Sequence, residues 1–281
     1  MWPLIHLSIE SPRFLAFDFA LPTYLVTISL TYCLCIGFAY IRAVKLDRPV
    51  TMALDICLAI MVGGFFGARL LHVFYEDPSY YFSNPLEIFK VWRGGFVFYG
   101  GLFGAWLASW ILIRKRGELF GPWADFFAPV LSVGYALGRI ACFLNGCCYG
   151  KFCEYPWAVD FHRPGMPIGP RHPTQLYASG FEFLVFALLL FLEPKYRRLS
   201  AQGSKWARPA HFFTLWLALH SIGRLIMEHF RDDDRGPLIA GLSLATWISL
   251  LLPGLFFGGR CVIERMQPIT RRPPKNRPGG S

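Results

Sequence analysis

The stretch GPWADFFAPVLSVGYALGRIACFLN, residues 121–145, decides how the fold of this chain is read. It is apolar over the roughly 20 residues that an α-helix needs to cross a hydrocarbon layer about 30 Å thick. Arg139 nevertheless lies near its end, and four cysteines gather around its exit: Cys142, Cys147, Cys148 and Cys153. The segment predicts a membrane-spanning helix, and an arginine inside such a helix is a functional candidate because burying its charge in lipid is unfavourable.

The rest of the chain repeats this apolar pattern. Of its 281 residues, 54% are hydrophobic and only 16% are charged, whereas about a quarter of a soluble domain is charged. The apolar runs are continuous rather than alternating, which favours helices over a barrel. The sequence predicts an all-α polytopic membrane protein with one membrane domain, residues 1–259, and a basic, disordered tail, residues 260–281. We expect about seven spans, at 21–41, 50–75, 95–114, 121–145, 174–193, 210–229 and 239–258.

The net charge of +10 would suit nucleic acid, but the placement of the basic residues argues against that partner. With the N-terminus outside, about twice as many Lys and Arg residues fall in the segments that face the cytoplasm as in the outside segments. The positive-inside rule therefore predicts an outside N-terminus and a cytoplasmic C-terminus. The first residues lack the basic region of a cleavable signal peptide.

Three arginines fall inside predicted spans: Arg69, Arg139 and Arg224. Glu228 lies four residues after Arg224, where it is placed to pair with it on one helical face. A positive pocket remains, and the planar guanidinium group suits a phosphate such as a phospholipid headgroup. The alternative is that the arginines only hold helices together, and Arg69 lies close enough to a span end to reach the interface.

Two glycine pairs flank Tyr99 in the segment RGGFVFYGGLFGA, residues 93–105. Glycine permits the backbone to bend and to approach a ligand closely. The same residues permit tight packing of two membrane helices. A tyrosine at this depth is also typical of the membrane interface.

The longest outside loop, residues 146–173, predicts a small extracytoplasmic cap. The segment RHPTQLY, residues 171–177, starts the next span and directs Gln175 and Tyr177 to the membrane surface. Four interpretations of the neighbouring cysteines remain open: a disulfide, a zinc site, a nucleophile or simple packing.

The motifs Gly138-Arg139, Asn145-Gly146 and Gly150, together with GGFFGARLLHVFY, NPLEIFKVWRGGFVFYGGLFGA, RHPTQLY and GRLIMEHFR, occur in a distinctive order. In this order they resemble the bacterial prolipoprotein diacylglyceryl transferase family over residues 15–235. The resemblance implies transfer of the diacylglyceryl group of phosphatidylglycerol to the lipobox cysteine of a prolipoprotein signal peptide, with release of glycerol phosphate. It further implies the bacterial inner membrane, an active site toward the extracytoplasmic face, and neither cofactor nor metal.

The resemblance also implies residue roles. The expected catalytic residues are Arg139, Arg224, Tyr99 and His220. The expected substrate-binding residues are Arg139, Arg69, Asn145, Gly150, Gly100, Gln175, Tyr177 and Glu228. The alternative is a non-catalytic relative that binds phospholipid or lipoprotein.

The sequence departs from the family pattern at several of these positions. The usual histidine is Tyr99 here, and His220 stands where tyrosine is frequent. Cys142 and Cys147 replace an asparagine and a glutamate of the signature, and Ala178 replaces a glutamate. These changes leave the arginines intact but leave the general base open between Tyr99 and His220.

Overall fold

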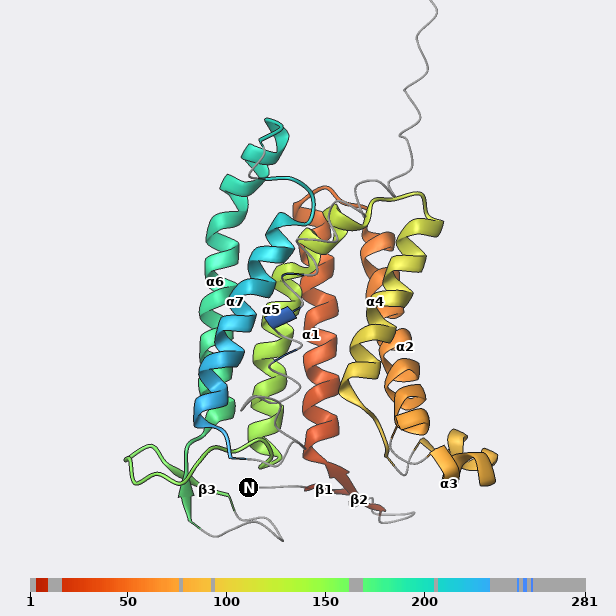
Figure 1. Cartoon of the computed structure of the whole chain (residues 1–281), viewed down its shortest axis with the longest axis vertical. Helices are drawn as coiled ribbons and strands as arrows, with labels where there is room; N and C mark the ends of the chain where they lie inside the picture. The colour runs from red at the N-terminus through yellow and green to blue at the C-terminus, as the bar shows by residue number, and fades with distance from the viewer. Residues whose placement is uncertain are drawn as a thin grey trace, which may run out of the picture.

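The computed structural model of the chain describes residues 4–9, 17–75, 78–91, 94–161, 169–204 and 207–232, with positions 247, 250, 251 and 254. Its main body is a bundle of long helices that run roughly side by side (Figure 1). The α-helices are α1 (Thr23–Lys45), α2 (Val50–Tyr75), α3 (Pro78–Ser83), α4 (Phe98–Lys115), α5 (Phe120–Leu144), α6 (Thr174–Ala201) and α7 (His211–Phe230), and a 3-10 helix, η1, covers Pro85–Phe89.

The helical architecture expected from the sequence is confirmed. Each of the first six predicted spans coincides with a long helix, although α6 continues through Pro194 for eight residues beyond the expected end. Four helices, α1, α2, α5 and α6, are long and apolar enough to cross a membrane. The seventh expected span and the tail lie outside the described residues, apart from the four isolated positions. The count of seven spans therefore stays a prediction.

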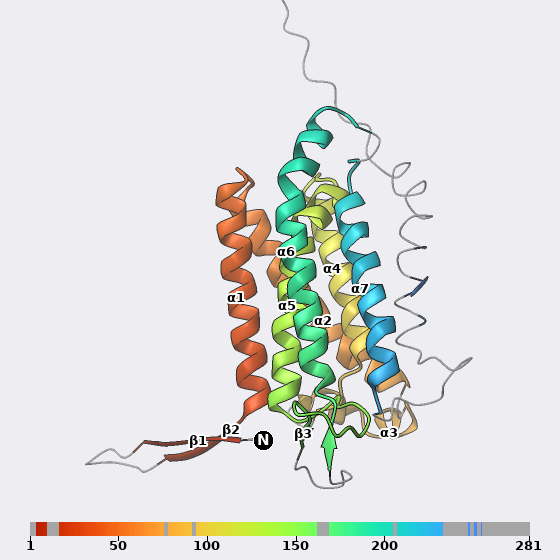
Figure 2. The same cartoon turned by 90° about the vertical axis from the view of Figure 1, so that its left-hand side faces the viewer.

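The structure adds short strands that the sequence analysis did not anticipate. Strand β1 (Leu4–Ile9) pairs antiparallel with β2 (Phe17–Pro22), and this hairpin projects sideways from the start of α1 (Figure 2). Strands β3 (Val159–Asp160) and β4 (Pro170–Arg171) pair within the loop between α5 and α6. Their presence fits the expected cap, whereas the strictly all-α description is incomplete.

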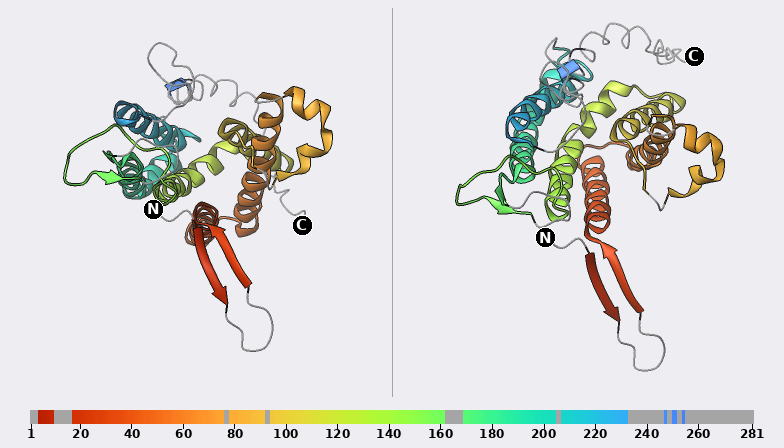
Figure 3. Two further views of the ribbon diagram at one scale, coloured as in Figure 1. Left: turned by 90° about the horizontal axis from the view of Figure 1, so that it is seen from below. Right: turned by 60° about the horizontal axis from the view of Figure 1, so that its bottom comes forward.

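Helices α2 and α4 form one unit of the bundle, and α5 with α6 and α7 forms another, with α1 against α5 (Figure 3). The first unit is held by two antiparallel glycine motifs, GGFFG at residues 63–67 and GGLFG at residues 100–104. A β-carbon added at Gly67 would lie 2.3 Å from the carbonyl oxygen of Gly100, and one at Gly104 would lie 2.2 Å from that of Gly63. The backbones therefore touch, as small residues allow in membrane bundles.

Large apolar side chains cover the outside of the bundle. Phe66 on α2 and Phe191 on α6 are 66% and 80% exposed. Patches of this kind are unusual on soluble monomers and suit contact with lipid chains. The outer surface therefore supports the expectation that these helices lie in a membrane.

The two ends of the bundle differ in composition. The connections at one end, 46–49, 116–119 and the described residues 202–204 and 207–210, lie within or beside the main basic segments of the described chain. Arg42 is buried at this end, where it forms an ion pair of 2.7 Å with Glu193 and donates to the carbonyl oxygen of Phe126. The end of α5 with the cysteines around it, the cap and the glycine-rich entry to α4 lie at the other end, and the end of α5 is the lower one in Figure 1.

Candidate active site

Arg224 on α7 is a buried charge that the described part of the chain leaves without a hydrogen bond or ion pair. Its exposed fraction is only 8%. The expected ion pair with Glu228 is wrong, because Arg224 has no such contact. An uncompensated guanidinium group in this position is unfavourable unless an anion accompanies it.

Arg139 on α5 belongs to a polar network that crosses the interior of the bundle. Its Nε and one terminal nitrogen donate to the hydroxyl oxygen of Tyr135, at 2.9 and 2.7 Å. The Tyr135 ring packs edge-on against His220 of α7, with centroids 4.5 Å apart. Nδ1 of His220 lies 3.0 Å from Oε2 of Glu182 on α6. Arginine, tyrosine, histidine and carboxylate thus follow one another from α5 to α6.

Glu182 is the best-satisfied member of this network. It is 1% exposed, and its Oε1 accepts hydrogen bonds from Trp216 Nε1 at 2.8 Å and Ser132 Oγ at 3.1 Å. An ionised carboxylate only accepts, so Nδ1 of His220 carries the proton in this contact. The lone pair of a neutral His220 is then on Nε2.

Arg139 and Arg224 lie at the same depth in the bundle. Helices α5 and α7 run in the same direction, and Tyr135 meets His220 between them. Each arginine follows its aromatic partner by four residues, which is about one turn on the same helical face. The backbone positions of both arginines therefore lie one turn beyond the Tyr135–His220 contact, toward the end with the cysteines, and the guanidinium group of Arg139 folds back onto Tyr135.

Arg69 on α2 is occupied by the backbone of the segment that leads to α4. Its guanidinium group donates to four carbonyl oxygens, those of Glu87, Ile88, Gly94 and Gly95, at 2.6 to 3.2 Å. Because four of its five N–H groups are used, the structure supports a positioning role for Arg69 rather than direct contact with a phosphate.

Tyr99 and Gly100 begin α4 at the same end of the bundle. Tyr99 is half-buried, with its ring edge-on to Phe98. Gly100 faces α2, because a β-carbon added at this position would collide with the carbonyl oxygen of Gly67. The close approach that Gly100 permits is to α2, so its part in binding a substrate would be indirect.

The chain after α5 folds back tightly through two left-handed residues. Asn145 caps α5, and Gly146 and Cys148 have φ values of +69° and +64°. Gln175 donates to the carbonyl oxygen of Cys147 at 2.6 Å, and Thr174 donates to that of Cys148 at 2.7 Å. The first turn of α6 therefore holds this loop in place.

Gly150 and Tyr177 lie where the cap meets the helix ends. A β-carbon at Gly150 would lie 2.7 Å from three neighbouring atoms, one of them the carbonyl oxygen of Phe230. The hydroxyl of Tyr177 accepts a hydrogen bond of 2.8 Å from Trp157 and lies 3.1 Å from Nδ1 of His172. Gly150 and Tyr177 thus connect the cap to α6 and α7. The side-chain oxygen Oε1 of Gln175 is buried and has no hydrogen-bond partner in the described chain.

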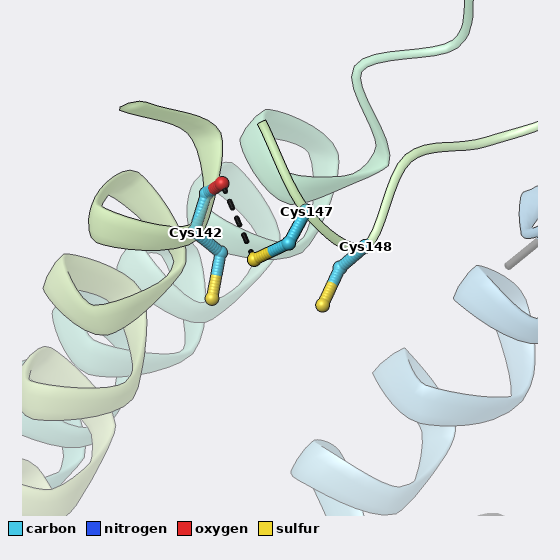
Figure 4. Close-up of side chains that lie close together, drawn as sticks. All are labelled: Cys142, Cys147 and Cys148. Carbon is cyan, nitrogen blue, oxygen red and sulfur yellow. Dashed lines mark hydrogen bonds between the residues drawn. The ribbon is translucent and has the colours of Figure 1, made fainter. Parts of the chain in front are cut away.

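Three of the four clustered cysteines converge. The sulfur atoms of Cys142, Cys147 and Cys148 all lie within 4.8 Å of one another (Figure 4). All seven cysteines in the described chain are free thiols, so the structure does not contain the disulfide considered from the sequence. Hydrogen bonds from the neighbouring thiols hold the pKa of Cys148 below its usual value, and the positive charges of Arg231 and Arg139 act in the same direction. Burial acts in the opposite direction but does not outweigh them. Cys153 is buried elsewhere in the cap.

Sequence reasoning did not select three members of the polar network: Tyr135, Trp216 and Ser132. Glu182 was likewise not among the expected site residues. The four-residue spacing of Tyr135 and Arg139 was a usable signal, because such pairs meet on a helix. The contacts to α6 and α7 had no sequence signal, since they join residues far apart in the chain, 50 positions for Ser132 with Glu182 and 85 for Tyr135 with His220.

A cavity of about 270 Å³ opens at the opposite, basic end of the bundle, lined among others by Asp125, Glu193 and Arg197. Asp125 precedes Cys142 by 17 residues on α5, which corresponds to about 25 Å along a helix. This cavity is therefore separate from the arginines and thiols described above.

A family model described as prolipoprotein diacylglyceryl transferase matches residues 12–259 of this sequence. The chain belongs to this family. The resemblance noted from the sequence motifs is therefore confirmed.

Curated relatives in the family match most of the chain, and each is named phosphatidylglycerol–prolipoprotein diacylglyceryl transferase. One from Bordetella avium is 38% identical over 208 residues, which cover 73% of this chain and 74% of the relative. One from Bordetella parapertussis is 34% identical over 247 residues, covering 84% and 90%. One from Aromatoleum aromaticum is 36% identical over 200 residues, covering 69% and 71%.

Proposed function

We propose that this chain transfers the diacylglyceryl group of phosphatidylglycerol to the lipobox cysteine of a prolipoprotein. The observation that carries the proposal is Arg224, a buried guanidinium group without a partner in the described chain, at the depth of Arg139. A phosphodiester headgroup supplies the anion that this arrangement lacks. Family membership and the names of the relatives support the same reaction.

The reaction moves negative charge from sulfur to phosphate. The substrate thiolate attacks a glycerol carbon, a carbon–sulfur bond forms, and the carbon–oxygen bond to phosphate breaks. Glycerol phosphate leaves with the bonding electron pair. Arg224 and Arg139 stabilise the charge that develops on the phosphate oxygens, and their placement before the reaction avoids reorganisation in a medium of low dielectric constant.

His220 is the better candidate for the group that accepts the thiol proton. Glu182 holds its Nδ1, so Nε2 presents a lone pair, and a carboxylate behind an imidazole stabilises the protonated form. A neutral imidazole has a ring-nitrogen lone pair that accepts a proton, whereas the phenol of Tyr99 has to lose its own proton before it can act as a base. His220 on α7 thus takes the role of the histidine that the family usually has at the position of Tyr99.

We expect His220→Ala to lower the rate of transfer by roughly 100-fold or more, the usual contribution of a general base. Tyr99→Phe should lower it by less than about tenfold, since a phenol that only positions substrate contributes little to proton transfer. The measurement is the turnover of a lipobox peptide with phosphatidylglycerol in detergent at several pH values. If Tyr99→Phe is the more damaging change, the proton acceptor lies on α4 and the assignment to His220 fails.

The function itself is tested by expressing the chain in bacteria depleted of their own transferase. We expect it to restore growth and to produce lipoprotein that carries a diacylglyceryl group, detected by mass spectrometry. A folded, membrane-inserted chain that binds phosphatidylglycerol yet restores neither would instead identify a non-catalytic relative.

We further propose that the chain resides in the bacterial inner membrane with seven spans, an outside N-terminus and a cytoplasmic C-terminus. The support is the gathering of the described basic loops at the end of the bundle opposite the thiols. The active site then faces the extracytoplasmic side, where prolipoproteins emerge. Reporter fusions at the two termini should give opposite signals for sidedness, and equal signals would rule this orientation out.

A further inference from the structure

We propose that Cys142, Cys147 and Cys148 form a binding site for one thiophilic metal ion of the Zn²⁺ type. The three sulfur atoms lie within 4.8 Å of one another and come from two separate backbone segments, the last turn of α5 and the loop after it (Figure 4). The proposal is independent of the transferase reaction.

The spacing of the sulfur atoms is close to that of a thiolate complex. Zinc–sulfur bonds are about 2.3 Å, so the sulfur atoms around one zinc ion lie about 3.8 to 4.0 Å apart. From separations within 4.8 Å, the side chains reach this geometry by small rotations. Three sulfur ligands favour soft ions over Mg²⁺ or Ca²⁺, which prefer oxygen.

The loop that carries two of the ligands is already held in its binding conformation. Cys148 has a left-handed backbone that a residue with a β-carbon rarely adopts. Buried Thr174 and Gln175 fix the carbonyl groups of Cys148 and Cys147 from α6. This support keeps the cysteine side chains on the face toward Cys142, so binding needs little ordering of the chain.

The surrounding charge suits the complex. Three thiolates and a divalent ion carry a net charge of −1, and binding releases to solvent the protons that the three thiols still carry. Arg139 lies one turn before Cys142 on α5 and interacts electrostatically with Cys142 and Cys148, while Arg231 interacts with Cys148. Two positive charges beside a single negative complex lower the cost of burying it.

The proposed site has three cysteine ligands, whereas the sequence suggested a group of four. Cys153 is not part of the cluster of three sulfur atoms that the described residues form. The fourth coordination position is therefore left for water, as in open zinc sites.

The test is a titration of the purified, full-length chain with Cd²⁺ in detergent. The chain is first reduced, and alkylation is used to confirm that every cysteine is a free thiol. We expect Cd²⁺ to produce a thiolate-to-cadmium charge-transfer band that saturates at one ion per chain and that Zn²⁺ abolishes by competition. Binding should tighten as pH rises, because protons leave the thiols. A reduced chain that gives no saturable band would overturn the proposal.

The variants Cys142→Ser, Cys147→Ser and Cys148→Ser should each weaken Cd²⁺ binding at least tenfold. Cys33→Ser and Cys153→Ser are matched controls, one exposed on α1 and one buried in the cap, and both should bind as the parent chain does. Cys147→Ser should retain its thermal midpoint and its lipid transfer, which separates loss of the metal site from misfolding. Equal binding by all five variants would contradict the assignment.

Discussion

Arg224→Ala is expected to abolish lipid transfer while leaving the bundle at least as stable as the parent chain. The side chain makes no hydrogen bond or ion pair with the described residues, so its removal breaks none of these with them and relieves a buried charge. The lost contact is to the phosphate in the transition state, and removal of one such donor lowers the rate about 100- to 1,000-fold. Turnover of a lipobox peptide and thermal unfolding in detergent measure the two effects.

Arg42→Ala is the matched control, because Arg42 is an equally buried arginine with the opposite properties. It pairs with Glu193 at 2.7 Å and donates to the carbonyl oxygen of Phe126 at the far end of the bundle. Its removal leaves Glu193 as an unpaired charge, which costs about 3–5 kcal/mol. The rate per folded molecule should stay near that of the parent. Full transfer by Arg224→Ala would remove the basis of the proposed phosphate contact.

Gly67→Ala is expected to separate α2 from α4, whereas Gly64→Ala is expected to be tolerated. The added methyl group at Gly67 would lie 2.3 Å from a backbone oxygen of Gly100, and backbone cannot rotate away. At Gly64 the nearest atoms are at 3.6 and 3.8 Å, an ordinary contact distance. Overpacking of this kind costs about 1–3 kcal/mol, measured by the unfolding midpoint of the two variants in the same detergent.

The same change should also lower lipid transfer through the residues that the two helices position. Gly67 precedes Arg69 by two residues, and its contact partner Gly100 follows Tyr99 directly. A shift of α2 therefore displaces the carbonyl groups that Arg69 binds and the entry to α4 together. If Gly67→Ala and Gly64→Ala unfold at the same temperature, the two glycine motifs do not control the spacing of the helices.

Among the residues expected at the site, the structure separates those that are committed to protein contacts from those that remain available. Arg69 is committed to four backbone carbonyl groups, and Gly100 to the packing of α2. Arg224 retains its bonding capacity among the described residues, and His220 retains Nε2. The chemistry is thus expected between α5 and α7, with α2 and α4 as support.

The sequence by itself determined the helices, the membrane character and the family. These properties depend on local runs of apolar residues, on glycine spacing and on motifs such as Gly138–Gly150, all of which are contiguous in the chain. The positions of Arg139 and Arg224 within membrane-spanning helices were predicted from the same local pattern.

Only the tertiary structure decided the partners of these charges. The carboxylate of Glu182 reaches His220 across 38 positions, and Arg224 lacks the neighbour that its four-residue spacing from Glu228 suggested. The convergence of three thiols likewise required the left-handed turn at Cys148, which α6 stabilises from a distant part of the sequence. Side-chain contacts between helices depend on how the helices rotate and cross, and that depends on packing rather than on local pattern.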